Sequence, residues 1–341
     1  MNNNLSEKSI KQKVINFFKN PKEALSFILP IVFALIMICP VPYYVTIGGG
    51  VLSLDDKIKI SGEKDKNGSL NSAYVMEIKS NVLFYLLSYV VPSYERSKVK
   101  DVILEEESIK DYAFRSRLDF TNSIDNATKV AFEKAGKEVK ITKTHFYVSY
   151  VFKEAITDIK TGDEIIKIEN SVISSYEELT NLITNYYYKD ELKITVLRDK
   201  KEIICYAKPT IIEEAKKIGI NIIEKYDLET NPKMTLNFTS SEQGPSGGLM
   251  LALNIYNKLV ANDITKGKKI VGTGTIDFDG TVGAIGGVKY KVMGAAKAKA
   301  DIFLVPIENY KEANDFKNEK GYKIKIIPIS SFDEALIELS K

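Results

Sequence analysis

The chain has 341 residues, enough for two modest domains and additional segments. Its formal net charge is only +3, and acidic and basic residues are intermixed, which excludes a basic surface built to bind nucleic acid. The two cysteines, Cys39 and Cys205, do not form a disulfide framework, and no Cys/His cluster has the spacing of a zinc site. We therefore predict no metal and no cofactor.

The N-terminal part has the pattern of a membrane anchor. No charged residue occurs between 24 and 54, and the apolar run at 25–41 is near the lower limit of the length that spans a bilayer. Lysines outnumber acidic residues before this run, and two adjacent tyrosines follow it. We expect a cytoplasmic basic tail at 1–23, a single-pass transmembrane anchor at 24–45 in the cell membrane, and extracytoplasmic domains after it.

Other fates of this segment were weighed against the anchor. A cleaved signal peptide needs small residues before its cleavage site, and 41–50 offers a poor one. A lipid on Cys39 would need a small residue in place of Ile38. A soluble form released by cleavage after the anchor also stays open. Three prolines and the basic flank argue against a buried core helix.

The region 46–138 is expected to form extracytoplasmic strands and a helix that pack with the C-terminal domain. Residues 70–95 alternate and then run apolar, which indicates strands or a buried segment. Residues 101–135 carry apolar side chains at helical spacing, and Gly136 is suited to end that helix.

The next region resembles a PDZ domain. The segment 145–183 predicts a strand, a Gly-Asp turn, a strand, a turn and a helix, and a strand pair follows. Ser175 is expected to cap the helix, with Glu178 completing a capping box. We place a PDZ-like α+β domain at 139–208. The resemblance implies that an extended peptide binds by strand addition.

This resemblance weakens in the region where peptide would bind. Bacterial relatives carry glycine in the binding loop, whereas this chain has His-Phe-Tyr at 145–147 and Glu-Ala-Ile at 154–156. The fold is expected to be retained, and peptide binding stays open. His145, the single histidine, is interpreted as a loop or strand-edge residue and not as a catalytic base.

Strands and helices alternate beyond residue 208, which predicts an α/β (α+β) domain at 209–341. The expected strands and extended segments are 233–240, 269–276, 282–288, 301–306 and 322–329. The expected helices are 246–261, 289–300, 309–318 and one that begins after Ser331.

Ser246 lies in a Gly-Pro-Ser-Gly-Gly turn between a strand and a helix. The amides at the start of a helix can bind an oxyanion, so this position suits a nucleophile. Gly244, Gly247 and Gly248 remove side chains where a substrate backbone must come close. Pro245 and the serine are also common at the start of a helix, so this turn alone leaves capping and catalysis open.

The following segments resemble the proteolytic domain of the Lon proteases. Thr-Gly-Thr-Ile at 273–276 matches the T-G-x-I element of that family, and 280–287 matches G-x-V-x-x-I-G-G. A lysine, an Ala-rich helix and an apolar strand ending in proline follow in the same order. From about 25 to 341 the chain is similar to the membrane-anchored PDZ–Lon proteases of Gram-positive bacteria, most specifically over 244–306.

The resemblance implies a Ser-Lys dyad, which needs no histidine. Lys289 and Lys291 both follow the glycine pair, and helical geometry does not choose between them. The family pattern assigns Lys291 as general base beside Ser246, and places Thr273 where it hydrogen-bonds the lysine. A lysine is a base only when neutral, and burial among apolar neighbours favours that form. Gln243 stands where an acidic residue is often found in the ATP-dependent Lon proteases.

These patterns predict a membrane-anchored serine endopeptidase. No G-x-x-x-x-G-K-[ST] loop occurs, so we expect ATP-independent cleavage of extracytoplasmic peptides and of flexible or membrane-tethered proteins. Because the ATP-dependent Lon proteases form hexameric rings, the resemblance also points to a homo-oligomer. The alternative is a catalytically inactive, membrane-anchored PDZ scaffold that binds peptides.

Overall fold

The computed structural model describes residues 21–212 and 214–341. The predicted tail at 1–23 lies almost wholly outside these residues. The described chain divides into two compact units, each built from two segments. The segments of the first unit are the residues up to Ile47 and Glu77–Val102, and those of the second are Gly48–Met76 and Ile103–Lys341.

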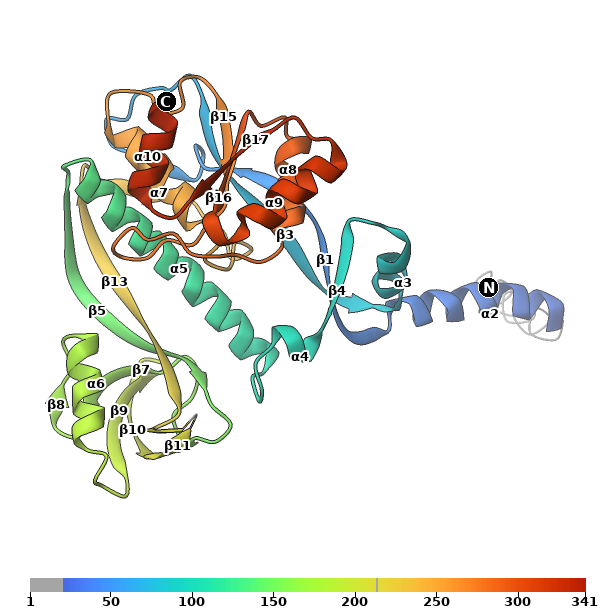
Figure 1. Cartoon of the computed structure of the whole chain (residues 1–341). Coiled ribbons are helices and arrows are strands. Elements are labelled where there is room, and N and C mark those ends of the chain that lie inside the picture. The colour runs from blue at the N-terminus through green and yellow to red at the C-terminus, as the bar shows by residue number, and fades with distance from the viewer. Residues whose placement is uncertain (1–20, 213) are drawn as a thin grey trace, which may run out of the picture. The chain divides into compact units, whose positions relative to one another are not determined.

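The first unit is built around a strand pair with helices attached (Figure 1). Its elements are α2 (Pro21–Ile38), parts of β1 (Pro40–Ser53) and β3 (Ser69–Asn81), α3 (Val82–Val90), β4 (Tyr94–Lys98) and α4 (Val99–Val102). β4 runs antiparallel to β1, with Tyr43 opposite Lys98. α3 begins after Asn81, whose side chain accepts a hydrogen bond from the Phe84 amide at 2.9 Å.

The predicted anchor at 24–45 is helical only as far as Ile38. Two prolines follow closely, at 40 and 42, and together they remove two amide donors from what would be the next helical turn, whereas α2 accommodates the single Pro30. The chain enters β1 instead, where Tyr44 and Val45 are buried side chains of a strand. Among the described residues no helix is both long and apolar enough to cross a membrane.

The apolar run that we expected to be strand or buried segment is an exposed helix. β3 ends at Asn81, and α3 follows directly. Four of its apolar side chains are exposed, namely Leu83, Leu86, Tyr89 and Val90, whereas Phe84 and Leu87 are half-buried. The expectation of burial was wrong for this run, because only Ser88 of the helix is buried.

In the second unit a sheet has the strand order β17-β16-β15-β3-β1, in which β1 and β3 contribute only the parts that belong to this unit. Its parallel strands β15 (Lys269–Gly272), β16 (Ile302–Pro306) and β17 (Lys325–Ile329) continue onto β3, which pairs in parallel with β15. The helices beside it are α5 (Ile109–Lys134), α7 (Gly248–Leu259), α8 (Val288–Lys297), α9 (Ile307–Lys320) and α10 (Phe332–Ser340).

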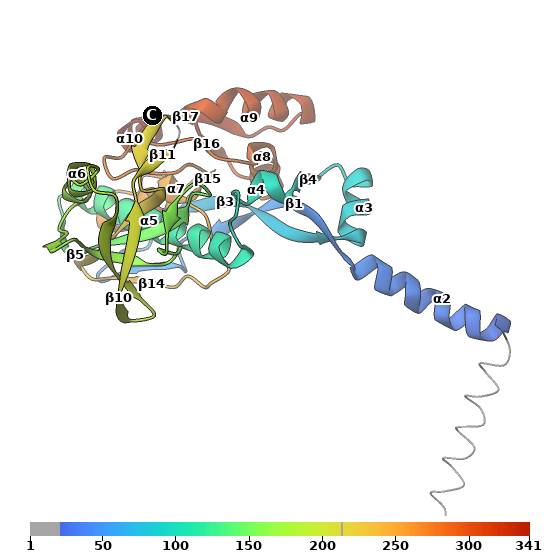
Figure 2. The same ribbon diagram turned by 90° about the horizontal axis from the view of Figure 1, so that it is seen from below.

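Successive side chains of these strands point to opposite faces of the sheet and pack in two different hydrophobic cores. Ile270 packs in the core that contains residues of α5, α7 and α10, whereas its neighbour Val271 packs with residues of α8 and α9. Ile302 and Phe303 divide in the same way. The sheet is therefore covered on both faces, as both views show (Figure 1, Figure 2).

A second sheet, of seven strands, forms a separate hydrophobic core with one helix, α6 (Tyr176–Asn185). Its strand order is β13 (Ile220–Asn231), β5 (Glu138–Val151), β7 (Glu164–Ile168), β9 (Leu192–Arg198), β10 (Lys201–Lys208) and β6 (Ile156–Thr157), with β8 (Ser171–Val172) beside β7. The sheet extends beyond the predicted limits of 139–208, because β13 pairs along almost the whole of β5.

The second sheet is inserted in the chain between α5 and the segment that carries Ser246. β5 follows α5 after a turn at Gly136, which has a positive φ of 64°. β13 leads into β14 (Met234–Leu236), which pairs with β2 (Ile58–Ile60). A further small hairpin consists of β11 (Thr210–Ile212) and β12 (Ala215–Lys217). No regular element lies between Leu236 and Gly248.

Candidate active site

Ser246 lies in the turn directly before α7 and is partly buried. The N-cap of α7 is Gly247, which makes no side-chain capping bond, so the serine hydroxyl is not the cap of this helix. Gly244 has a φ of 77°, a left-handed conformation that favours glycine. A Cβ at Gly248 would lie 2.7 Å from Ser123 Oγ, so the tight packing of this turn also requires a glycine there.

The amides at the start of α7 are not all available to a substrate. Gly248 donates its amide hydrogen to the carbonyl of Pro245 at 3.1 Å, and Leu249 donates to the carbonyl of Gly274 at 3.1 Å. We expected the start of this helix to supply an oxyanion hole. An oxyanion would have to use other amides of the turn, because these two already have acceptors.

Thr273 connects the serine to the lysine. It is fully buried and follows β15 directly. Its hydroxyl donates to the carbonyl oxygen of Ser246 at 2.9 Å and accepts a hydrogen bond from the amine of Lys291 at 3.1 Å. The neighbouring amide of Gly274 also donates to the carbonyl of Ser246, at 2.8 Å. The backbone of the serine is thereby held against the residue that holds the lysine.

The two candidate lysines on α8 have different surroundings. Lys291 is only 2% exposed and lies among the buried residues of α8, together with Val288, Val292 and Ala295. The side chain of Lys289 is 52% exposed, and its amine lies 3.7 Å from a carboxylate oxygen of Glu312. Only Lys291 is thus in the apolar environment that suits a neutral amine.

Several contacts to the serine turn come from residues that the sequence patterns did not single out. Arg117 and Ser123 on α5 bond the backbone of the turn, and Ser72 on β3 lies against Gly247. Lys57 forms an ion pair with Glu242 at 2.9 Å. No motif marks these positions, because their partners lie more than a hundred residues away in the chain.

His145 has a structural role in the second sheet. It is not in a loop or at a strand edge, as expected, but lies within β5, opposite Lys225 of β13. Its Nδ1 is 2.6 Å from Glu164 Oε1, and its Nε2 is 3.1 Å from Asp227 Oδ2. The hydrogen bond with His145 is the main cause that lowers the pKa of Asp227. Within the described residues, no group of His, Cys, Asp and Glu side chains is arranged to hold a metal ion.

The chemical groups that meet here are a partly buried serine, a buried amine and a threonine hydroxyl that joins them. The amine is a base in its neutral form, and the serine is a nucleophile once its proton is removed. This combination supports acyl transfer, in which a carbonyl carbon is attacked by the serine oxygen.

Comparison with known protein families matches residues 159–340 to the Lon protease (S16) C-terminal proteolytic domain. The Lon protease of Aster yellows witches'-broom phytoplasma (strain AYWB) is 27% identical over 212 residues, which cover 60% of this chain and 26% of the relative. The Lon protease of Clostridioides difficile (strain 630) is 27% identical over 158 residues, covering 43% of this chain and 20% of the relative. The chain thus spans about a quarter or less of these relatives' lengths.

Proposed function

Because the chain belongs to the Lon protease (S16) C-terminal proteolytic domain family, we propose that it is a serine endopeptidase with Ser246 as nucleophile and Lys291 as general base. Membership of this family makes the matched region a serine endopeptidase domain. The observation that carries the assignment of residues is the hydroxyl of Thr273, which bonds both the amine of Lys291 and the backbone of Ser246.

In the proposed reaction the neutral amine of Lys291 takes the proton of the Ser246 hydroxyl as the serine oxygen attacks the peptide carbonyl. The tetrahedral intermediate collapses when the lysine returns this proton to the leaving amine, and an acyl-enzyme remains. Water, deprotonated by the same lysine, then hydrolyses the ester and restores the serine. Thr273 holds the lysine amine in place throughout, and its own hydroxyl stays bonded to the serine carbonyl.

The test is cleavage of unfolded casein by the full chain in mild detergent, without ATP. We expect Ser246→Ala and Lys291→Ala to abolish cleavage, while the matched variant Lys289→Ala remains active. Activity that survives in Ser246→Ala would exclude the serine as nucleophile. Loss in Lys289→Ala with retention in Lys291→Ala would reverse the assignment of the lysine. An inactive parent chain that still binds peptide would favour the scaffold function.

We further propose that this peptidase acts without ATP, on extracytoplasmic peptides and on flexible or membrane-tethered proteins. A P-loop is absent from the 341 residues. Without a P-loop, these residues offer no ATP-driven unfolding of a substrate. We therefore expect the substrates to be extended before they reach Ser246. The second sheet is proposed to be a PDZ-like domain. The expected strand, turn, helix and strand-pair pattern supports this, with β7, α6 and the β9–β10 hairpin in that order.

We also propose that the first unit attaches the protein to a membrane. The support is the apolar surface of α2, most of whose large side chains are exposed, including Leu29 and Phe33 at 62% and 60%. The lysine-rich sequence ahead of it supports a cytoplasmic N-terminus.

Membrane attachment is tested by extracting isolated membranes with alkaline carbonate and then with detergent. We expect the parent chain to resist carbonate and to enter detergent, and the double variant Leu29→Lys, Phe33→Lys to be released by carbonate. Protease added to intact spheroplasts should degrade the second unit if it is extracytoplasmic. Complete release of the parent by carbonate, or full protection in spheroplasts, would refute the respective part of the proposal.

A further inference from the structure

The loop before Ser246 is held by a helix that lies outside the matched family region. α5 spans Ile109–Lys134, whereas the family match begins at residue 159. Nevertheless, α5 bonds the loop at several points: Gly244 donates its amide hydrogen to the carbonyl of Ser116 at 3.0 Å, and the Ser123 hydroxyl donates to the carbonyl of Pro245 at 3.3 Å. Hydrogen bonds therefore hold the turn that contains Ser246 against α5.

Arg117 makes two further hydrogen bonds from α5 to this loop. Its Nη1 donates to two backbone carbonyls of the loop, those of Thr239 at 2.9 Å and Glu242 at 2.8 Å. The guanidinium lies 5.1 Å from the ring of Phe120, a residue of the hydrophobic core one turn further along α5. A planar, always charged donor that is packed on a ring and bonded to two carbonyls fixes both its own position and that of the loop.

The side chain of Glu242 makes further hydrogen bonds that stabilise the same loop. Its carboxylate accepts a hydrogen bond from the amide of Thr239 at 2.7 Å and from the amine of Lys57 at 2.9 Å. Burial alone would raise the pKa of Glu242, but the hydrogen bonds from Thr239 and Lys57 outweigh it and hold the pKa at about 2. The backbone carbonyl and the side chain of one residue are thus bonded by two cations, Arg117 and Lys57.

We propose that Arg117 is a positioning residue that, together with Glu242 and Lys57, keeps the loop 239–245 in the conformation that aligns Ser246 with Thr273 and Lys291. This inference rests on the proposed function of Ser246. The loop has no regular secondary structure of its own, so its alignment depends on these bonds. Because a displacement of about 1 Å at a reacting atom can reduce rate by about 100-fold, loosening this loop lowers turnover more than binding.

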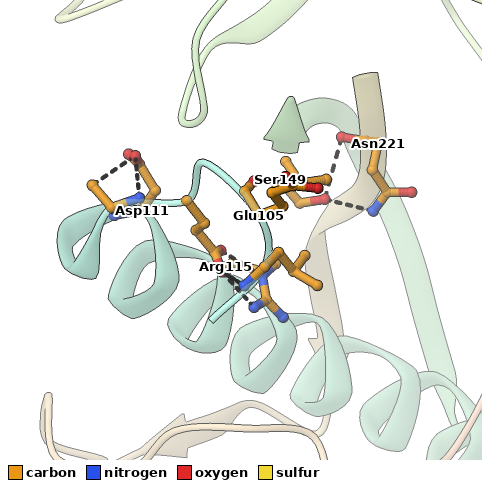
Figure 3. Close-up of polar contacts among 9 residues, drawn as sticks. Glu105, Asp111, Arg115, Ser149 and Asn221 are labelled. Carbon is orange, nitrogen blue, oxygen red and sulfur yellow. Dashed lines mark hydrogen bonds and ion pairs between the residues drawn. The ribbon is translucent and has the colours of Figure 1, made fainter. Parts of the chain in front are cut away.

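The matched control is Arg115, on the same helix. It pairs with Glu107 through two hydrogen bonds, of 2.7 and 2.9 Å, and the side chain of Glu107 is 1% exposed. Figure 3 shows Arg115 on α5, together with Glu105 and the bonded side chains of Ser149 and Asn221, which belong to the second sheet. Arg115→Ala leaves the buried carboxylate of Glu107 without its cation and with the bond from the Leu104 amide, so it is expected to cost more stability than Arg117→Ala.

The experiment compares the full-length parent with Arg117→Ala, Arg117→Lys and Arg115→Ala in peptide cleavage. We expect Arg117→Ala to lower kcat about 10- to 100-fold with KM changed less than about twofold, and Arg117→Lys to recover part of kcat. Arg115→Ala should keep kcat at temperatures below its melting transition, although it melts earlier. Unchanged kcat in Arg117→Ala, or an equal loss in Arg115→Ala, would overturn the inference.

Hydrogen–deuterium exchange separates this inference from the proposed function. Arg117→Ala should speed exchange in the segment 239–247, and Arg115→Ala should not, whether or not the chain cleaves the chosen peptide. If Ser246→Ala cleaves as fast as the parent, the proposed function fails while the exchange result still tests the contact. If activity depends on Ser246 but neither kcat nor exchange responds to Arg117→Ala, the positioning role alone is wrong.

Discussion

Replacing Thr273 with valine removes the hydroxyl that joins the proposed serine and lysine and changes little else. The side chain is fully buried, and valine has nearly the same shape. Two hydrogen bonds are lost, at 2.9 Å to the carbonyl of Ser246 and at 3.1 Å from the amine of Lys291. The backbone bond from the Thr273 amide to the carbonyl of Leu304 at 3.0 Å is retained, so β15 should stay in register.

The magnitude follows from these two bonds. At about 1 kcal/mol each, their loss lowers the free energy of unfolding by about 2 kcal/mol. The serine carbonyl keeps its bond from Gly274, so the larger part of the effect falls on the orientation of Lys291. If the hydroxyl stabilises the transition state by about 2 kcal/mol more than it stabilises the free enzyme, its loss corresponds to about a 30-fold drop in kcat/KM.

The assay is kcat/KM for peptide cleavage by the full chain, together with urea unfolding. Thr275→Val is the matched control, because Thr275 lies two residues away and its hydroxyl accepts a single bond from the Gly283 amide at 3.1 Å. We expect that control to lose about 1 kcal/mol of stability and to keep its activity. Full activity in Thr273→Val, or an equal loss in Thr275→Val, would refute the reasoning that Thr273 orients the lysine.

Two further results follow from the serine turn. The pKa of Glu242 is lowered to about 2, so the contribution of its carboxylate to stability should be complete above pH 4.5 and lost as the pH falls towards 2. Glu242→Gln should remove this pH dependence, and urea unfolding measured across that pH range checks it. Gly247→Ala should retain activity, since the close contact of its Cβ would be with the hydroxyl of Ser72 at 3.0 Å. Gly248→Ala should lose most activity and stability, because its Cβ would lie 2.7 Å from Ser123 Oγ and 2.9 Å from a backbone nitrogen. Casein cleavage by the two variants checks this contrast, and equal activity would contradict it.

Local sequence patterns anticipated the helices of the C-terminal part better than its strands. The predicted strands at 233–240 and 269–276 are strand only at Met234–Leu236 and Lys269–Gly272, and 282–288 contains no strand. The helix expected after Ser331 is α10, with Ser331 as its N-cap, and the expected strand at 301–306 is β16. The predicted helix C-cap, Gly136, has the left-handed conformation expected just past a helix end. In each case a side chain or a backbone preference acts within one turn of the chain, so the signal is visible in the sequence itself.

The capping box predicted at Ser175 formed only in part. The Ser175 hydroxyl accepts a hydrogen bond from the Glu178 amide at 3.1 Å, as expected. The carboxylate of Glu178, however, bonds the amide and the hydroxyl of Ser174 in place of the Ser175 amide. Two adjacent serines offered nearly equal donors, and the pattern of residue types does not distinguish between them.

Contacts between distant segments could not be derived from such patterns. The alternation in β3 indicates a strand, but its partner, β15, begins two hundred residues later, with Ser69 opposite Lys269. Arg117 has the appearance of an ordinary surface charge on a helix, and only the folded chain brings it to the loop before Ser246. The glycine and serine motif indicated the candidate site, whereas the residues that support this turn come from pairings that carry no local signal.

The inserted second sheet enters and leaves the rest of the fold at one place. Glu138, at the start of β5, is directly opposite Asn231, at the end of β13, in an antiparallel pair. Such partners lie about 5 Å apart, so a tight turn could join them if everything between were excised. A domain with closely spaced ends could therefore replace the insertion without lengthening any connection to α5 or to the serine turn. The replacement would also have to cover the part of α5 that β13 contacts, for example where Lys225 pairs with Asp125 at 3.3 Å.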